Sequence, residues 1–328
     1  MPEPILPDDP ARELRQLVEG GRYREALEAH RRGGEKFVRR PEMELLAATA
    51  ATRLGELGVG VTLAESALVH FRGRADTDGR MRAMNLLGAI AFEHGRLEEA
   101  QRCFGDALDL ARTLDDTRMA AHASNNLASV AHLRGQPDLA LSLYRSALLA
   151  YQRLGDRRGT AQTYHNLSLA FRQQEAWEDA EDAALESVRH AEQVGDGGLL
   201  SLAVTGRAET HINRGELDLA KQELLRAEKL AVQADDEVGL AEVRRLGALL
   251  ALKQGNHQDA ADLALVARAV AQKYGILQLQ AECAGIAGAA YRHLKRSGEA
   301  DRYRSEAFKL FERLGAEKLK QDLDRLLG

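Results

Sequence analysis

The sequence repeats itself with a period of forty residues. Written in rows of that length, the 328 residues place the same kinds of side chain in the same columns. One column holds Ala100, Ala140, Ala180, Ala220, Ala260 and Ala300, and a second, seven residues later, holds Ala107, Ala147, Ser187, Ala227, Ala267 and Ala307. A fixed period of roughly 20 to 50 residues is typical of proteins built from stacked repeats.

Each unit is predicted to be two amphipathic helices joined by a short turn. In Thr117–Asp156 the turn is expected at Gly135, and Gly95, Gly215 and Gly255 occupy the same column, which Glu175 and Lys295 interrupt. Glycine adopts the left-handed conformation that ends a helix. A further column, of small residues, is expected where two helices approach closely: Gly88, Ala128, Ser168, Ala208, Ala248 and Gly288.

These residues resemble the tetratricopeptide repeat. The family pattern of a small residue, turn Gly, Ala, aromatic and Ala is matched by Gly88, Gly95, Ala100, Phe104 and Ala107, and again by Ala128, Gly135, Ala140, Tyr144 and Ala147. Asn126-Leu127 and Asn166-Leu167 match its Asn-Leu pair. The common period is about 34 residues; a period near forty is found in sensor domains of some bacterial transcriptional activators, in kinesin light chains and in Pins-type adaptors. The resemblance implies an all-α, right-handed α-solenoid of about eight helix-turn-helix units.

The domain organisation follows from the register of the columns. Residues 1–10 are rich in proline and acid and are expected to be disordered. Residues 11–316 are expected to form one solenoid, with the clearest internal loop at residues 73–79. Residues 317–328 are expected to end the chain as a capping helix with an apolar stripe of leucines.

Composition excludes several classes of function. A net charge of −5 and a pI near 6.1 argue against a nucleic-acid partner. The two cysteines, Cys103 and Cys283, are too far apart in sequence for a metal knuckle. No signal peptide and no apolar run long enough to span a membrane are visible, which predicts a cytoplasmic protein without membrane insertion.

No catalytic motif, phosphate-binding glycine loop or metal-ligand spacing is present, so the chain is predicted not to be an enzyme and to bind no metal or cofactor. His122, His132 and His165 have no known ligand spacing. Trp177, the only tryptophan, stands in the column of Leu97 and Leu217 and is interpreted as a packing residue at the start of a second helix.

The resemblance places the binding surface on the first helix of each unit, where positions i, i+3, i+7 and i+10 share one face. The two central units carry almost only polar, uncharged or basic residues there. Two interpretations remain open: a concave groove that binds a peptide or helix, or polar residues that bond one another between helices. The candidate peptide-binding residues are Arg82, Asn85, His122, Asn125, Ser129, His132, Gln162, His165, Arg172, Gln173, Thr205 and Arg245.

The resulting functional prediction is an adaptor or scaffold that binds a segment of another protein. The alternative is a regulatory sensor that responds to a small peptide or metabolite and acts on a separate output protein. Self-association through the end repeats is a further possibility under either prediction.

Overall fold

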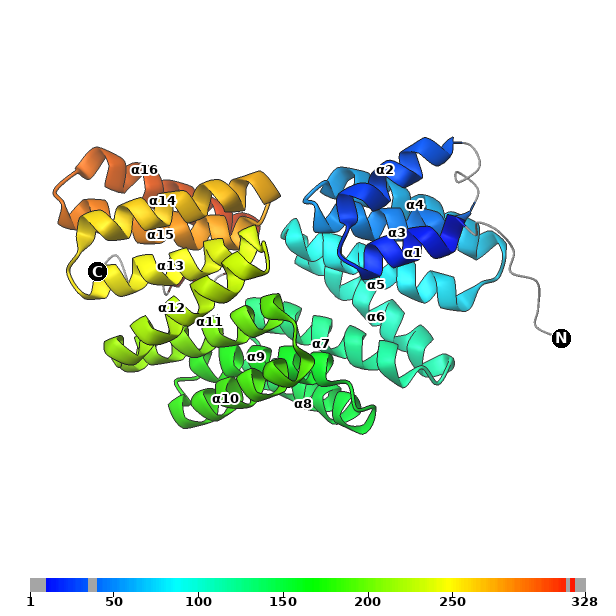
Figure 1. The fold of residues 1–328 in the computed structure, drawn as a ribbon, viewed down its shortest axis with the longest axis horizontal. Helices are drawn as coiled ribbons and strands as arrows, with labels where there is room; N and C mark the ends of the chain where they lie inside the picture. Colours follow the sequence, from blue (N-terminus) through cyan, green and yellow to red (C-terminus); the bar gives the residue numbers. More distant parts are fainter. Residues whose placement is uncertain (1–9, 35–39, 317–318, 322–328) are drawn as a thin grey trace. The chain divides into compact units, whose positions relative to one another are not determined.

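The structure is a computed structural model that describes residues 10–34, 40–316 and 319–321. Within these ranges every regular element is a helix, and consecutive helices pair across short turns (Figure 1). The all-α prediction is therefore confirmed. The first six helices are α1 (Pro10–Glu19), α2 (Tyr23–Gly33), α3 (Pro41–Arg53), α4 (Leu57–Gly73), α5 (Thr77–Glu93) and α6 (Leu97–Thr113). The next ten are α7 (Thr117–Leu133), α8 (Pro137–Arg153), α9 (Arg157–Gln173), α10 (Trp177–Val194), α11 (Gly197–Arg214), α12 (Leu217–Gln233), α13 (Glu237–Lys253), α14 (His257–Tyr274), α15 (Leu277–His293) and α16 (Ser297–Arg313).

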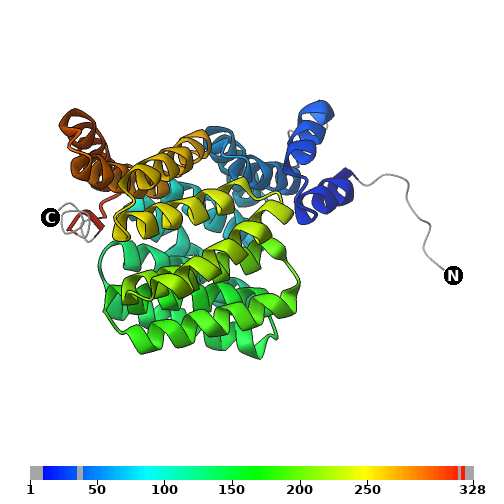
Figure 2. The ribbon, with the colours of Figure 1, turned by 60° about the vertical axis from the view of Figure 1, so that its left-hand side comes forward.

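The chain divides into two compact parts, each of several repeats, which we call the first unit and the second unit. The first comprises the residues up to Phe92 together with Glu98–Asp116, and the second comprises Glu93–Leu97 and the residues from Thr117 onward. In the second unit, α9, α11 and α13 each pack on their own second helix, on the preceding second helix and on the next first helix. Figure 2 shows these consecutive helical hairpins from a second direction. A single solenoid over residues 11–316 stays a prediction.

The alanine columns form the core between paired helices, as predicted. Ala100, Ala140, Ala180, Ala220 and Ala260 are all fully buried, and Ala300 is 7% exposed. The small-residue column marks the closest approach of first and second helices. A Cβ atom built on Gly88 would lie 2.7 Å from the Phe104 ring, so a larger residue would separate α5 from α6.

Aspartate side chains cap the N-termini of four of the first helices. The carboxylates of Asp76, Asp156, Asp196 and Asp236 each accept a hydrogen bond from the backbone N–H three residues later, at 2.8–3.0 Å. This is the helix N-cap arrangement, which satisfies one of the free donors of the first turn. These four aspartates therefore mark helix starts.

The turn geometry is retained where the glycine column is interrupted. Glu175 and Lys295 adopt left-handed backbone angles with φ of 59° and 60°, close to the 67° of Gly135. A residue with a side chain is disfavoured there by roughly 1–2 kcal/mol. The packing of the flanking helices outweighs this local preference.

The predicted loop at residues 73–79 is shorter than expected. Helix α4 continues to Gly73 and α5 begins at Thr77, which leaves three connecting residues. Asp76 caps α5 and thereby allows this early start. Most of the predicted capping helix at 317–328 and most of the N-terminal segment at 1–10 lie outside the described residues; residues 319–321 are helical.

Candidate functional site

All twelve candidate binding residues lie on first helices, but they are divided between the two units. Arg82 and Asn85 are on α5 in the first unit. Arg82 is exposed and forms an ion pair with Asp78 one turn earlier, while Asn85 is half-buried. The other ten lie on α7, α9, α11 and α13 of the second unit.

On α7 the polar side chains bond to the neighbouring helices. His122 Nδ1 lies 2.9 Å from the Tyr151 hydroxyl, and the Ser129 hydroxyl lies 3.0 Å from that of Tyr144, both on α8. Asn125 Oδ1 accepts hydrogen bonds from two α9 side chains, Thr163 Oγ1 at 3.2 Å and Asn166 Nδ2 at 3.3 Å. These contacts hold α7 against its neighbours.

Arg172, near the end of α9, is almost completely enclosed. Its side chain is 8% exposed, and its Nη2 donates to Glu209 Oε2 on α11 at 2.7 Å. Nη1 reaches the Gly206 carbonyl at 3.2 Å and the Thr210 hydroxyl at 3.4 Å. A buried ion pair of this kind is stable only when such further hydrogen bonds satisfy its remaining polar atoms.

The ion pair continues across the next two first helices. Glu209 Oε1 lies 3.4 Å from Arg245 on α13, and Arg245 Nε lies 2.9 Å from Glu242 and 3.1 Å from Glu282 on α15. Charges therefore alternate from helix to helix. We call this set the charge ladder: Arg172, Glu209, Arg245, Glu242 and Glu282.

The ladder runs obliquely to the repeat. Arg172 and Glu209 are 37 residues apart, and Glu209 and Arg245 are 36 residues apart. Both separations are shorter than the repeat period of forty residues. On the next first helix, each of these charged partners therefore lies three or four residues, about one helical turn, before the position that the period would give. Two further ion pairs span 38 residues: Arg118 with Asp156, which caps α9, and Arg268 with Glu306, on the second helices α14 and α16.

The electrostatics of the ladder follow from burial and pairing. Burial favours the neutral form of Glu209, but Arg172 and Arg245 outweigh it and lower the pKa of this carboxyl to about 2. Burial raises the pKa of Glu282, against the effect of Arg245. Burial, and then the charge of Arg172, lowers the pKa of His132 and His165 to about 4, so both imidazoles are neutral at pH 7.

Two of the candidate residues carry buried polar atoms with no hydrogen-bond partner in the described part of the chain. They are His132 Nδ1 near the end of α7 and Gln173 Oε1 at the end of α9. They are 41 residues apart, as are Asn125 and Asn166, whose side chains are hydrogen-bonded between the same two helices. The two unpaired atoms therefore lie at equivalent positions two helical turns further along α7 and α9.

The remaining candidates differ in accessibility. Gln162 is exposed, and His165 is half-buried. Thr205 is buried and donates to the Ser201 carbonyl of its own helix at 2.7 Å. Arg245 belongs to the charge ladder. The α7 and α9 candidates thus lie on two neighbouring first helices, whereas Arg82 and Asn85 lie in the other unit.

The three ladder glutamates are not among the candidate residues, because the prediction was based mainly on the polar, uncharged or basic side chains of the two central repeats. A signal was present. Opposite charges recur on first helices at 37 and 36 residues, just short of the period. Among the described residues, no cluster of three or more His, Cys, Asp or Glu side chains is arranged to hold a metal ion.

A family model described as "Tetratricopeptide repeat" matches residues 119–193, which lie in α7 to α10. This part of the chain is similar to tetratricopeptide repeats, the family that the sequence pattern resembles. The other helix pairs of the second unit continue the same alanine columns. No curated protein matches the sequence.

Several solved structures share the fold of these tetratricopeptide repeats. A Rap protein complexed with competence and sporulation factor is 12% identical, covers 97% of this chain and 95% of its own, and has a TM-score of 0.65. NprR in complex with its cognate peptide NprX is 13% identical, with coverage of 98% and 97% and a TM-score of 0.60. Aspartyl phosphate phosphatase F from Bacillus subtilis is 13% identical, with coverage of 99% and 94% and a TM-score of 0.55. At these identities the likeness concerns the fold.

None of the helices in the described residues combines the length and the apolar character that a bilayer crossing requires.

Proposed function

We propose that this protein is a cytoplasmic, non-enzymatic interaction module that binds an extended peptide segment of a partner protein across α7 and α9. The observation that carries the proposal is the pair of unpaired polar atoms, His132 Nδ1 and Gln173 Oε1. Leaving such an atom without a partner costs roughly 1–3 kcal/mol. Both residues are half-buried, so rotation of the side chain brings its polar atoms to a bound main chain.

A peptide main chain suits these two side chains. Its N–H groups donate to the amide oxygen of Gln173, and either a C=O or an N–H group pairs with the imidazole of His132, depending on its tautomer. The charge ladder holds α9, α11, α13 and α15 in place beside this position, which keeps the binding face preorganised. The fold similarity to NprR in complex with its cognate peptide is consistent with a peptide ligand.

The test starts from peptides selected against the protein from a random phage-displayed library. Fluorescence anisotropy then compares wild type with the double variant His132→Leu/Gln173→Met, in which both unpaired atoms are removed. We expect affinity to fall about 10- to 100-fold, as expected for two lost hydrogen bonds, without a lower melting temperature. Gln222→Met, an exposed position on α12, is the matched control. Unchanged affinity in the double variant would place the site elsewhere.

A sensor and an adaptor differ in their response to the same peptide. Small-angle scattering with and without the selected peptide separates them. A change in maximum dimension supports the sensor, and an unchanged one supports the adaptor. A scattering mass that corresponds to more than one copy of the chain would instead indicate self-association.

A further inference from the structure

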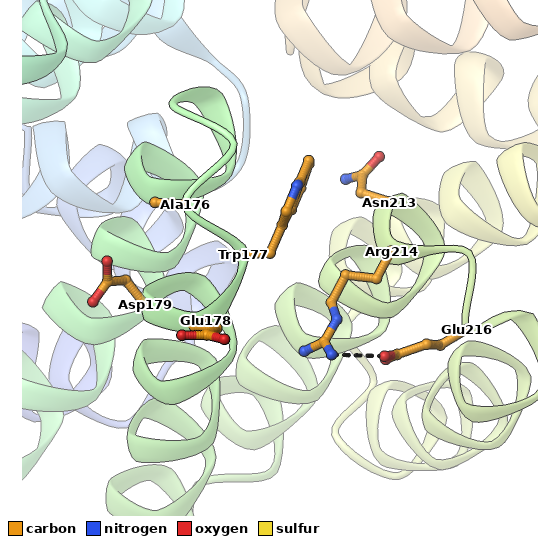
Figure 3. Close-up of a pocket in the computed structure, with 7 residues that line it drawn as sticks. All are labelled: Ala176, Trp177, Glu178, Asp179, Asn213, Arg214 and Glu216. Carbon is orange, nitrogen blue, oxygen red and sulfur yellow. Dashed lines mark ion pairs between the residues drawn. The ribbon is translucent and has the colours of Figure 1, made fainter.

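A pocket lies away from α7, at the turns between helices of the second unit. It has a volume of about 690 Å³. One wall is the start of α10 and the other is the end of α11 with the start of α12 (Figure 3). We call it the turn pocket; its lining residues are Ala176, Trp177, Glu178, Asp179, Asn213, Arg214 and Glu216.

The repeat explains why the pocket is open. Trp177 and Asn213 occupy the columns that His257 and His293 occupy two repeats later, eighty residues on in each case. There, the two imidazoles stack with ring centroids 4.3 Å apart and planes at 6°. Figure 3 shows the Trp177 indole projecting from the start of α10 toward the end of α11, where Asn213 stands. The Trp177 ring therefore lacks the second aromatic ring that fills the equivalent gap.

The charge around the indole is negative. Glu216 is paired with Arg214 at 2.9 Å and with His211 at 2.7 Å. Within the described chain, Glu178 and Asp179 form no ion pair with a basic side chain. The last carbonyls of α11 carry partial negative charge, and the first N–H groups of α10 and α12 carry partial positive charge, so the side-chain carboxylates determine the sign. The lining carries three carboxylates and one guanidinium, a net charge of −2.

We propose that the turn pocket binds the guanidinium group of an arginine side chain presented by a partner protein. Guanidinium is planar, stacks on an indole face and donates to carboxylates. It therefore satisfies both the open aromatic face of Trp177 and the free carboxylate of Glu178. This site is separate from the polar face of α7 and α9, and the inference does not depend on the function proposed for that face.

Trp177 also provides the measurement, because it is the only tryptophan in the protein and its fluorescence reports on this pocket alone. The probe is a capped Gly-Arg-Gly peptide, compared with the same peptide carrying lysine or citrulline, the uncharged isostere of arginine. We expect a saturable change in fluorescence with the arginine peptide and weaker binding of the other two. Glu178→Gln/Asp179→Asn is expected to weaken binding about 2- to 30-fold, the range for the loss of two exposed ion pairs.

Asn213→His is a second variant, which places an imidazole opposite Trp177, at the position equivalent to His293 in the stacked pair His257–His293. It keeps the tryptophan but fills the gap, so the arginine peptide should no longer bind. Trp177→Leu, the residue found at the equivalent positions 97 and 217, tests the indole by calorimetry. Melting curves confirm that each variant folds. Equal binding of the citrulline or lysine peptide, or only the linear quenching shown by free N-acetyltryptophanamide, would overturn the proposal.

Discussion

At the scale of single residues, Gly206 decides how closely α11 approaches α9. A Cβ atom at this position would lie 2.6 Å from Nδ1 of His165 and 2.8 Å from its Cε1. Atoms do not come so close without displacement, so the imidazole fills the space that glycine leaves. The absence of a side chain at one residue thus allows a polar residue of the neighbouring helix to be enclosed.

We therefore expect Gly206→Ala to destabilise the protein although alanine favours helices. Overpacking against His165 costs roughly 1–3 kcal/mol, which exceeds the gain in helix propensity of up to about 1 kcal/mol. Gly247→Ala on α13 is the control, since its Cβ atom would meet only Leu263 Cδ1 at 3.6 Å and should stabilise. Urea denaturation measures both. Equal effects of the two substitutions would show that His165 moves aside freely.

The same enclosure makes stability depend on pH. The folded pKa of His132 and His165, about 4, is below the ordinary 6.5 of histidine. Between these pH values the unfolded chain binds more protons than the folded one, so stability falls as the pH is lowered from 6.5 to 4. We expect a slope of at most about 1.4 kcal/mol per pH unit for each histidine. His132→Gln should flatten the measured dependence, and an unaltered slope would contradict the assignment.

At the scale of helices, the charge ladder joins four consecutive first helices. Each buried arginine contacts carboxylates on neighbouring helices, and Glu209 lies between Arg172 and Arg245. Arg172 is thus fully engaged within the protein, as is Asn125 by α9. Removal of either side chain is expected to lower stability as well as any binding.

Glu209→Gln tests the ladder directly. It leaves two buried guanidinium groups without their shared carboxylate, and breaking a buried ion pair costs roughly 3–5 kcal/mol. We expect a loss of about 3 kcal/mol, because the amide keeps part of the hydrogen bonding. The control is Glu192→Gln, whose pair with Arg226 at 2.6 Å is exposed and should contribute less than about 1 kcal/mol. Similar losses in both variants would show that the ladder adds no specific stability.

At the scale of the whole molecule, stability is expected to arise from contacts between adjacent repeats. Each forty-residue repeat buries its apolar face only against the adjacent repeats. A substitution that disturbs the packing of one interior repeat therefore also weakens its contacts with both neighbours. Ala140 is fully buried in α8, and it stands in the alanine column shared by six units. The column is a property of the repeated contact rather than of any one helix.

Ala140→Arg should therefore lower the melting temperature strongly. The side chain must be forced between α7 and α8, at a cost of about 3 kcal/mol or more. Ser142→Arg, two residues later on the exposed face of the same helix, is the matched control and should melt within a degree or two of wild type. Comparable melting of the two variants would show that the column does not mark a packed interface.

The helix pairs, their turns and the buried alanine columns could all be predicted from the sequence, because they depend on local periodicity and on residues that recur in every unit. The polar residues of α7 and α9 could be placed on first helices for the same reason. Their partners could not be predicted, because the side chains that meet are 36, 37 or 41 residues apart rather than one period apart. Which residues meet depends on how neighbouring first helices pack and on the reach of each side chain. Only the tertiary structure therefore decided that Arg172 meets Glu209, and that the gap beside Trp177 stays open while the one beside His257 is filled.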